Sequence, residues 1–306
     1  MNFLRNVKFW FFLSLMGTTG LCVYLFSGSF KELGNCFQPL SFPIIFLVSA
    51  IFLSNLCVAA FRLQIIYKKM GLFIPYIKIF RAFLTGQISS LLFFPSLTSF
   101  YGQTLVLSKS NKKIGHNVTA YLIDRFISLA VGFSLALAGL FILKRELFQK
   151  ILSENNQLLP LFISLATAFF FVIKKFFSLQ QIWSMFLENF FYILLLSFLS
   201  LVSWIAMGSI FMILYKIFDP QTSTILVMAA SFIISFAASL PITPNGWGIR
   251  EVTAIKAFGF LGLQVHKGLF IGFTVGSLAT VLIIVTFYLV CMPNFIKKMI
   301  FHENTK

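Results

Sequence analysis

The sequence predicts an all-α polytopic membrane protein, and three observations support this fold class. Of the 306 residues, 59% are hydrophobic and only 10% are charged, whereas a soluble domain carries about 25% charged residues. Several apolar runs approach or exceed the ~20 residues that cross a bilayer as a helix. The runs are continuous and do not alternate as the strands of a membrane barrel would. We expect one integral membrane domain over residues 1–306, with about eight transmembrane helices and a pair of re-entrant hairpins.

The expected spans are the long apolar runs of the chain, which short polar loops separate. In chain order they are Phe9–Phe26, Phe42–Phe61, Leu72–Phe94, Val118–Leu143, Leu158–Ile173, Phe190–Ile217, Thr222–Leu240 and Leu269–Met292. The first run is long for a signal peptide, and no small-residue cleavage site follows it, so we expect a retained helix. Two further apolar stretches, Pro95–Leu107 and Pro241–Leu263, are interrupted or too short to cross, and we interpret them as the Pro/Gly-broken re-entrant hairpins.

Lysine and arginine residues in the loops set the expected orientation, because basic loops stay in the cytoplasm. Basic residues precede the first span and follow the second, at Arg5, Lys8, Arg62, Lys68 and Lys69. A simple crossing by Leu72–Phe94 would place the next basic loop, Lys109–Lys113, on the outside. A re-entrant Pro95–Leu107 returns that loop to the cytoplasm, and a re-entrant Pro241–Leu263 does the same for the later basic loops. Both termini are therefore expected in the cytoplasm.

One broken stretch falls in each half of the chain, the halves being residues 1–155 and 156–306. Paired Pro/Gly-interrupted segments in corresponding halves indicate a transporter site that is built from an internal repeat. The halves share no visible sequence identity, so the repeat is expected from this pattern alone.

The segment SLPITPNGWGIRE (Ser239–Glu251) places helix breakers and a charge pair between two apolar runs. Its prolines and glycines are Pro241, Pro244, Gly246 and Gly248. The prolines forbid a regular helix, and the glycines allow backbone conformations that side chains block. We expect a helix to restart near Gly248 with Glu251 in its first turn. Free amides at this start, beside Arg250, would bind an anion; the alternative is a surface loop whose charges are solvated.

Charged residues also interrupt two other apolar runs. A polar stripe at helical spacing consists of Lys78, Arg81, Thr85 and Ser89. We expect this stripe to face the protein interior, the alternative being that its basic residues snorkel to the surface. Asp124 and Arg125 are adjacent in one helix and cannot simply pair with each other. We expect Asp124 to pair with Arg81 or Arg62. Arg125 would contact a lipid phosphate or Glu251, and structural pairing between helices is the alternative to substrate contact.

Other functional classes find no support in the sequence. The net charge of +16 comes mostly from short loops, so nucleic-acid binding is not expected, although some of these charges would hold anionic lipid headgroups. The four cysteines lack the spacing of a disulfide framework or a metal site. No nucleotide-binding or hydrolase motif is present, so we expect no cofactor, no metal and no catalytic activity.

The segment LPITPNGWGIRE resembles the Pro-x-x-Pro-Gly-Gly-x-Gly-x-x-Glu signature of the lysylphosphatidylglycerol synthase transmembrane-domain family, also called flippase-like proteins. The matching positions are Pro241, Pro244, Gly246, Gly248 and Glu251, and Asn245 replaces the usual first glycine. AFRLQIIYKKMG resembles the end of the family's second helix and matches at Arg62. LIDRFISLAVGFSLAL resembles its Asp-Arg helix and matches at Asp124 and Arg125. The likeness extends in order over nearly the whole chain.

The sequence departs from this family at FFPSLTSFYGQTLVL. The family usually has Pro, then Gly-Gly-Asp and an Arg, in this stretch. Here Pro95 remains, but the residues that follow include Ser99, Phe100, Tyr101 and Thr104. The departure implies either that the first hairpin lacks the polar role that it has in the family or that the lipid headgroup is different.

The resemblance implies a protein similar to the flippase half of multiple peptide resistance factors, which move aminoacylated phosphatidylglycerol between leaflets. We expect translocation of an anionic or headgroup-modified lipid (a phospholipid, aminoacyl-phospholipid or polyprenyl-linked glycolipid) across a bacterial inner membrane. One alternative is a lipid-linked glycosyltransferase or another lipid-modifying enzyme, and another is a non-transporting subunit of a separate lipid synthase. A separate synthase and a second copy of the chain are the candidate protein partners.

Roles for the candidate site residues follow from this expectation. Arg250, Arg125 and Arg81 would engage the lipid phosphate. Asp124 and Glu251 would orient these arginines or gate a polar path. The other candidate substrate-binding residues are Arg62, Pro241, Pro244, Asn245, Gly246 and Gly248.

Overall fold

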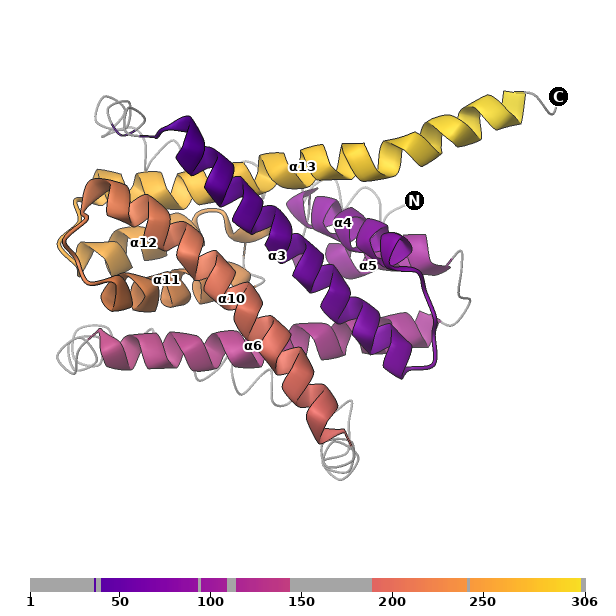
Figure 1. The fold of residues 1–306 in the computed structure, drawn as a ribbon, viewed down its shortest axis with the longest axis horizontal. Helices are drawn as coiled ribbons and strands as arrows, with labels where there is room; N and C mark the ends of the chain where they lie inside the picture. The colour runs from indigo at the N-terminus through magenta and orange to yellow at the C-terminus, as the bar shows by residue number, and fades with distance from the viewer. Residues whose placement is uncertain are drawn as a thin grey trace, which may run out of the picture.

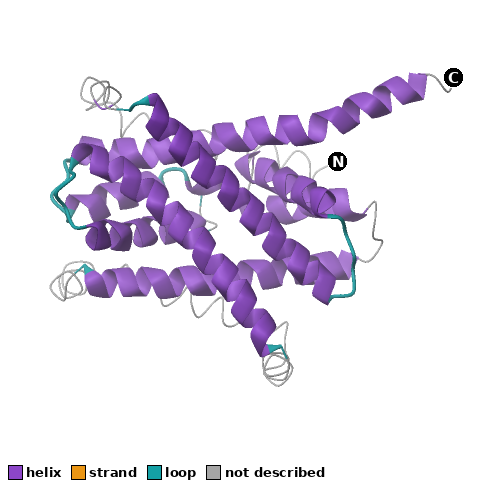
Figure 2. Cartoon of the chain, in the orientation of Figure 1, coloured by secondary structure: helices purple, strands orange, loops and turns teal. Residues whose placement is uncertain are grey.

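The computed structural model describes residues 36, 40–92, 95–108, 114–143, 189–240 and 243–303. Within these ranges every regular element is a helix (Figure 2). The elements are α3 (Phe42–Lys69), α4 (Tyr76–Leu92), α5 (Pro95–Ser108), α6 (Ile114–Ile142), α10 (Phe190–Phe218), α11 (Thr224–Ser239), the 3₁₀ turn η1 (Pro244–Gly246), α12 (Ile249–Gly259) and α13 (Val265–Glu303).

Helices α3, α6, α10 and α13 form the spanning framework of the described chain. Each contains a stretch long and apolar enough to cross a membrane. They confirm the predicted helices at Phe42–Phe61, Val118–Leu143, Phe190–Ile217 and Leu269–Met292. The predicted spans Phe9–Phe26 and Leu158–Ile173 lie outside the described residues.

Two predicted spans are shorter in the structure, and one predicted interruption is absent. Helix α4 begins at Tyr76, because Gly71 has a φ of +76° and residues 72–75 form no regular structure. A residue before a proline disfavours the helical conformation, so the helix starts only after Pro75. Helix α11 has 16 residues and ends at Ser239. Helix α5 is regular from Pro95 onward and not broken as predicted, because proline at the first helical position lacks only an N–H that would have no partner there.

The short helices are arranged as two helical hairpins, α4–α5 and α11–α12. Figure 1 shows them on opposite sides of the molecule, both lying between α6 and α13. Helices α4 and α5 approach closely: a Cβ at Gly86 would lie 2.7 Å from Cγ of Gln103, and one at Gly102 would lie 2.9 Å from the carbonyl oxygen of Thr85. The η1 turn at the tip of the α11–α12 hairpin contacts α4. The two hairpins therefore meet inside the framework of long helices.

The described elements follow the same order in each half of the chain. A long helix, a hairpin of short helices and a second long helix occur as α3, α4–α5 and α6, and again as α10, α11–α12 and α13. This is the order that an internal repeat would produce.

Large apolar side chains cover the outer face of the framework. Phe42, Phe141 and Phe191 are 79%, 78% and 83% exposed, respectively. A soluble protein of this size does not expose such a surface, whereas lipid tails cover it at no cost. The phenylalanine-rich surface is thus a lipid-facing one.

Candidate functional site

A buried ion pair joins α3 to α6. Nε of Arg62 donates to Oδ1 of Asp124 at 2.6 Å, and each residue is 5% exposed. This confirms one of the two partners predicted for Asp124. Charges inside a membrane protein are costly unless they are paired and hydrogen-bonded, so both side chains depend on this contact.

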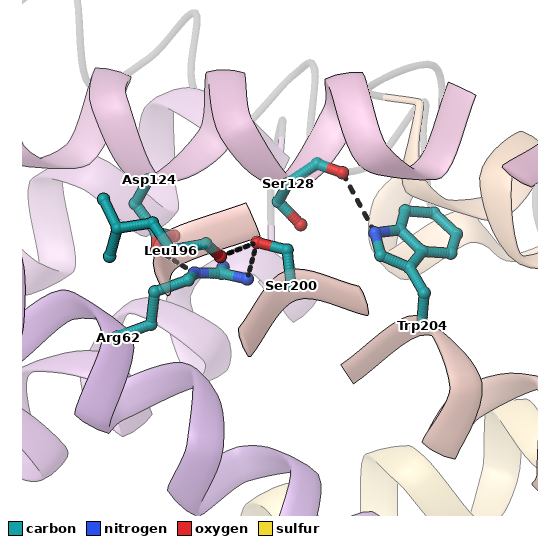
Figure 3. Close-up of polar contacts among 6 residues, drawn as sticks. All are labelled: Arg62, Asp124, Ser128, Leu196, Ser200 and Trp204. Atoms are coloured by element: carbon teal, nitrogen blue, oxygen red, sulfur yellow. Dashed lines mark hydrogen bonds and ion pairs between the residues drawn. The ribbon is translucent and has the colours of Figure 1, made fainter. Parts of the chain in front are cut away.

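Ser200 extends the pair to α10 (Figure 3). Nη1 of Arg62 donates to Oγ of Ser200 at 2.8 Å, and this hydroxyl donates in turn to the carbonyl oxygen of Leu196 at 2.8 Å. Ser200 is fully buried. We call Arg62, Asp124 and Ser200 the three-helix junction. Ser200 was not among the predicted site residues. Its signal in the sequence is a small polar residue within an apolar run, because serine hydroxyls form hydrogen bonds between membrane helices.

One turn after Ser200, Trp204 of α10 packs against α6 and forms a hydrogen bond with its backbone. Its Nε1 donates to the carbonyl oxygen of Ser128 at 2.9 Å (Figure 3). The indole occupies the space that a side chain at Gly132 would need, since a Cβ there would overlap the ring. A glycine at this position thus lets a large ring reach the neighbouring backbone.

Replacing Gly132 with alanine is expected to destabilise the protein by about 1–3 kcal/mol, because the indole must leave its place and lose its hydrogen bond. Denaturant unfolding in detergent micelles measures the change. Gly115→Ala on the same helix is the matched control, because a Cβ there meets nothing within 4 Å; it is expected to be neutral or slightly stabilising. Equal stability of the two variants would contradict this packing.

The backbone at the tip of the α11–α12 hairpin is irregular. Asn245, Gly246 and Gly248 have φ angles of +50°, +72° and +84°, a region that favours glycine and tolerates asparagine. A Cβ at Gly246 would lie 2.5 Å from the carbonyl oxygen of Ala238. The glycines therefore allow a turn that closes tightly against the end of α11.

Helix α12 restarts directly after this turn, as predicted. Gly248 is its N-cap, and a carboxylate oxygen of Glu251 accepts a hydrogen bond from the Gly248 N–H. Glu251 is 2% exposed, and its other oxygen, Oε1, finds no hydrogen-bond partner among the described residues. A buried carboxylate oxygen without a partner is costly, so this atom is available to a ligand or water.

A hydrogen bond to the backbone holds Arg250 beside the tip. Its Nη2 donates to the carbonyl oxygen of Asn245 at 2.7 Å. Its Nη1 is buried without a described partner and lies against Gly276 of α13, where a Cβ would overlap it. The hydrogen bond from Nη2 thus orients the guanidinium. The N–H groups of Nη1 stay without acceptors in the space beside Gly276.

Aromatic and polar contacts also join the tip to α13. The rings of Trp247 and Phe273 meet edge to face with centroids 5.7 Å apart. Nδ2 of Asn245 donates to Oγ1 of Thr280 at 3.3 Å. We call Asn245, Trp247, Arg250, Glu251 and Gly276 the tip cluster.

A known protein family matches most of the chain, including the segments that form the three-helix junction and the tip cluster. The model of the family "Lysylphosphatidylglycerol synthase TM region" matches residues 11–287. The chain belongs to this family. No curated protein and no solved structure matches it.

The structure of this lysylphosphatidylglycerol synthase TM-region protein separates the predicted site residues into different environments. Arg62 and Asp124 form the three-helix junction, whereas Asn245, Arg250 and Glu251 lie in the tip cluster. No ion pair is recorded between the tip cluster and Arg125 within the described residues, so the predicted Arg125–Glu251 contact is not formed. Pro241 lies outside the described residues, and Pro244 is placed in η1 by its backbone alone.

The predicted stripe on α4 is only partly interior. Nε of Arg81 donates to the carbonyl oxygen of Val290 on α13 at 3.1 Å, and Arg81, Thr85 and Ser89 are half-buried. Lys78 is exposed, as snorkelling predicts. Thr85 and Ser89 donate to carbonyl oxygens one turn earlier, so their hydroxyls are used within α4. In the structure, Arg81 ties α4 to α13.

Proposed function

We propose that this membrane protein translocates an anionic or headgroup-modified lipid across the bilayer, acting as a transporter and not as an enzyme. The observation that carries the proposal is Arg250: a guanidinium 7% exposed whose Nη1 has no partner among the described residues. Membership of a family of lysylphosphatidylglycerol synthase membrane regions supports a lipid as the ligand.

The tip cluster has the chemistry that a phosphate-bearing headgroup requires. Arginine stays charged in proteins and offers several donors in a fixed plane, which match phosphate oxygens. Leaving such a charge buried and unpaired costs several kcal/mol. An incoming phosphate would remove that cost, so the resting arrangement favours binding of an anion at Nη1.

Glu251 gives the same cluster an acceptor for the rest of the headgroup. Its Oε1 is buried without a described partner, while its other carboxylate oxygen caps α12. A headgroup with an ammonium or a hydroxyl would donate to this oxygen. Phosphate at Arg250 and a donor at Glu251 together would favour polar or aminoacylated headgroups.

Leaflet exchange in reconstituted vesicles tests the proposal. Vesicles of phosphatidylcholine and phosphatidylglycerol would carry a fluorescent phosphatidylglycerol, with dithionite quenching the outer leaflet. The wild-type protein is expected to accelerate exchange, and Arg250→Gln to slow it about tenfold or more, because a charged hydrogen bond is lost. Lys256→Gln is the matched control, since Lys256 is an exposed cation on the same helix. Unchanged exchange in a folded Arg250→Gln protein would reject the assignment.

The same preparation separates the alternatives. Transfer of radiolabel from a donor to lipid by the purified protein would favour a lipid-modifying enzyme. Exchange that occurs only after a lipid synthase is added would favour a non-transporting subunit. We propose a separate synthase and a second copy of this chain as the protein partners to look for by co-purification.

A further inference from the structure

Helices α5 and α6 face each other along a polar seam. They are neighbours in the chain and contact each other, and helices joined by a short connection pack antiparallel. The rings of Phe100 and Tyr121 meet at the middle of the seam, with centroids 5.6 Å apart. Helical periodicity then places Thr104 opposite Asn117 on one side of these rings, and Arg125 on the other side.

Several polar atoms in this seam lack hydrogen-bond partners. Asn117 is 1% exposed, and neither its Oδ1 nor its Nδ2 has a partner among the described residues. The same holds for Oγ1 of Thr104 and Nε of Arg125, both of which are buried atoms. Each buried polar atom without a partner costs roughly 1–3 kcal/mol, so the seam is built to hold water or a ligand.

The charge of the seam favours an anion. Arg125 lies over the ring of Tyr121, with its Cζ 5.3 Å from the ring centroid. Its neighbour Asp124 is engaged by Arg62 in the three-helix junction. Helix α5 contains no acidic or basic residue at all. Among the described side chains of α5 and α6, the seam thus offers a cation, an amide and a hydroxyl, which all donate to phosphate oxygens.

We propose that the α5–α6 seam is a second phosphate site, which receives the headgroup of an anionic lipid before it reaches the tip cluster. Arg125 supplies the positive charge, and Asn117 and Thr104 supply donors nearer the α5–α6 connection. This inference rests on the proposed function, because it assigns an entry position to the same lipid. The seam begins at the end of α6 that the basic loop Lys109–Lys113 precedes, where anionic headgroups concentrate.

Thiol labelling tests the seam. In a variant whose four native cysteines are serine, Asn117→Cys would be treated with a water-soluble, negatively charged methanethiosulfonate. Leu122→Cys is the matched control, because Leu122 is 41% exposed on the same helix and faces lipid. Labelling needs water and a thiolate. In phosphatidylcholine nanodiscs we expect Asn117→Cys to react several-fold faster than Leu122→Cys.

Protection of the thiol at position 117 from labelling then identifies the ligand. Replacing part of the phosphatidylcholine by phosphatidylglycerol is expected to slow labelling of Asn117→Cys several-fold, and Arg125→Gln is expected to abolish that protection. Size-exclusion chromatography confirms that each variant remains folded. Labelling as slow as at Leu122→Cys would overturn the seam, and labelling unaffected by phosphatidylglycerol would overturn the phosphate site. Protection by inorganic phosphate but not by phosphatidylglycerol would overturn the lipid assignment.

The labelling rate is independent of transport. A wild-type protein that fails to accelerate leaflet exchange would reject the proposed function even if phosphatidylglycerol protects Asn117→Cys. Conversely, leaflet exchange without protection of Asn117→Cys would retain the proposed function and reject the phosphate site in the seam.

Discussion

Replacing Asp124 with asparagine is expected to destabilise the protein by about 3–5 kcal/mol, the cost of leaving one partner of a buried ion pair without its counter-charge. Arg62 is 5% exposed and donates to Asp124 and Ser200. The asparagine would keep the shape and one acceptor oxygen but not the negative charge. The guanidinium of Arg62 would then be buried without a counter-charge.

Denaturant unfolding in mixed micelles, followed by tryptophan fluorescence, measures this loss. The double variant Arg62→Met/Asp124→Leu is the informative control. It removes both charges together, and apolar replacements of a whole buried pair are often neutral. We expect it to recover most of the stability that Asp124→Asn loses. If Asp124→Asn were as stable as the wild type, the ion pair of the three-helix junction would not contribute to the free energy of unfolding.

Replacing Gly246 with alanine is expected to be the most damaging change at the hairpin tip. Its φ of +72° costs an L-residue about 1–2 kcal/mol. The new Cβ would also lie 2.5 Å from the carbonyl oxygen of Ala238, and relieving this overlap adds about 1–3 kcal/mol. Because Arg250 is held by the carbonyl of the adjacent Asn245, a shifted tip would also slow lipid exchange.

Gly262→Ala separates these two causes. Gly262 has a φ of +89°, but a Cβ there meets nothing within 4 Å. This variant is expected to lose only the backbone contribution and to exchange lipid normally. Unfolding and leaflet exchange are measured on both proteins. If Gly246→Ala matched Gly262→Ala in both assays, the close packing of the tip against α11 would be refuted.

Much of the helical framework could be predicted from the sequence because it follows from apolar length alone. The long runs that became α3, α6, α10 and α13 need no information about neighbours. The restart of α12 after Gly248 was also predictable, since prolines and glycines act locally. The boundaries failed where two local signals compete: Pro75 delays α4, and Pro95 begins a regular helix although it was interpreted as an interruption.

The sequence predicted several of the residues that belong to the candidate sites, but it did not predict which of them contact one another. Helical spacing gives the direction in which Asp124 points but not the helix that it meets, so Arg62 and Arg81 remained equal choices. Ser200 and Trp204 carry no motif; their importance comes from tertiary contacts with α3 and α6. Gly132 and Gly276 are similar, because only the structure shows which side chain occupies the space that each glycine leaves.

In the proposed transport cycle, the contacts of α10 with the first half of the chain restrict which parts can move. Rocking of one half against the other would have to separate Ser200 from Arg62 and withdraw Trp204 from its recess beside Gly132. In each proposed cycle, both steps would leave buried polar groups without hydrogen-bond partners. We therefore expect the three-helix junction to stay fixed during the proposed transport. Displacement of the two short hairpins around it would open the path for the lipid.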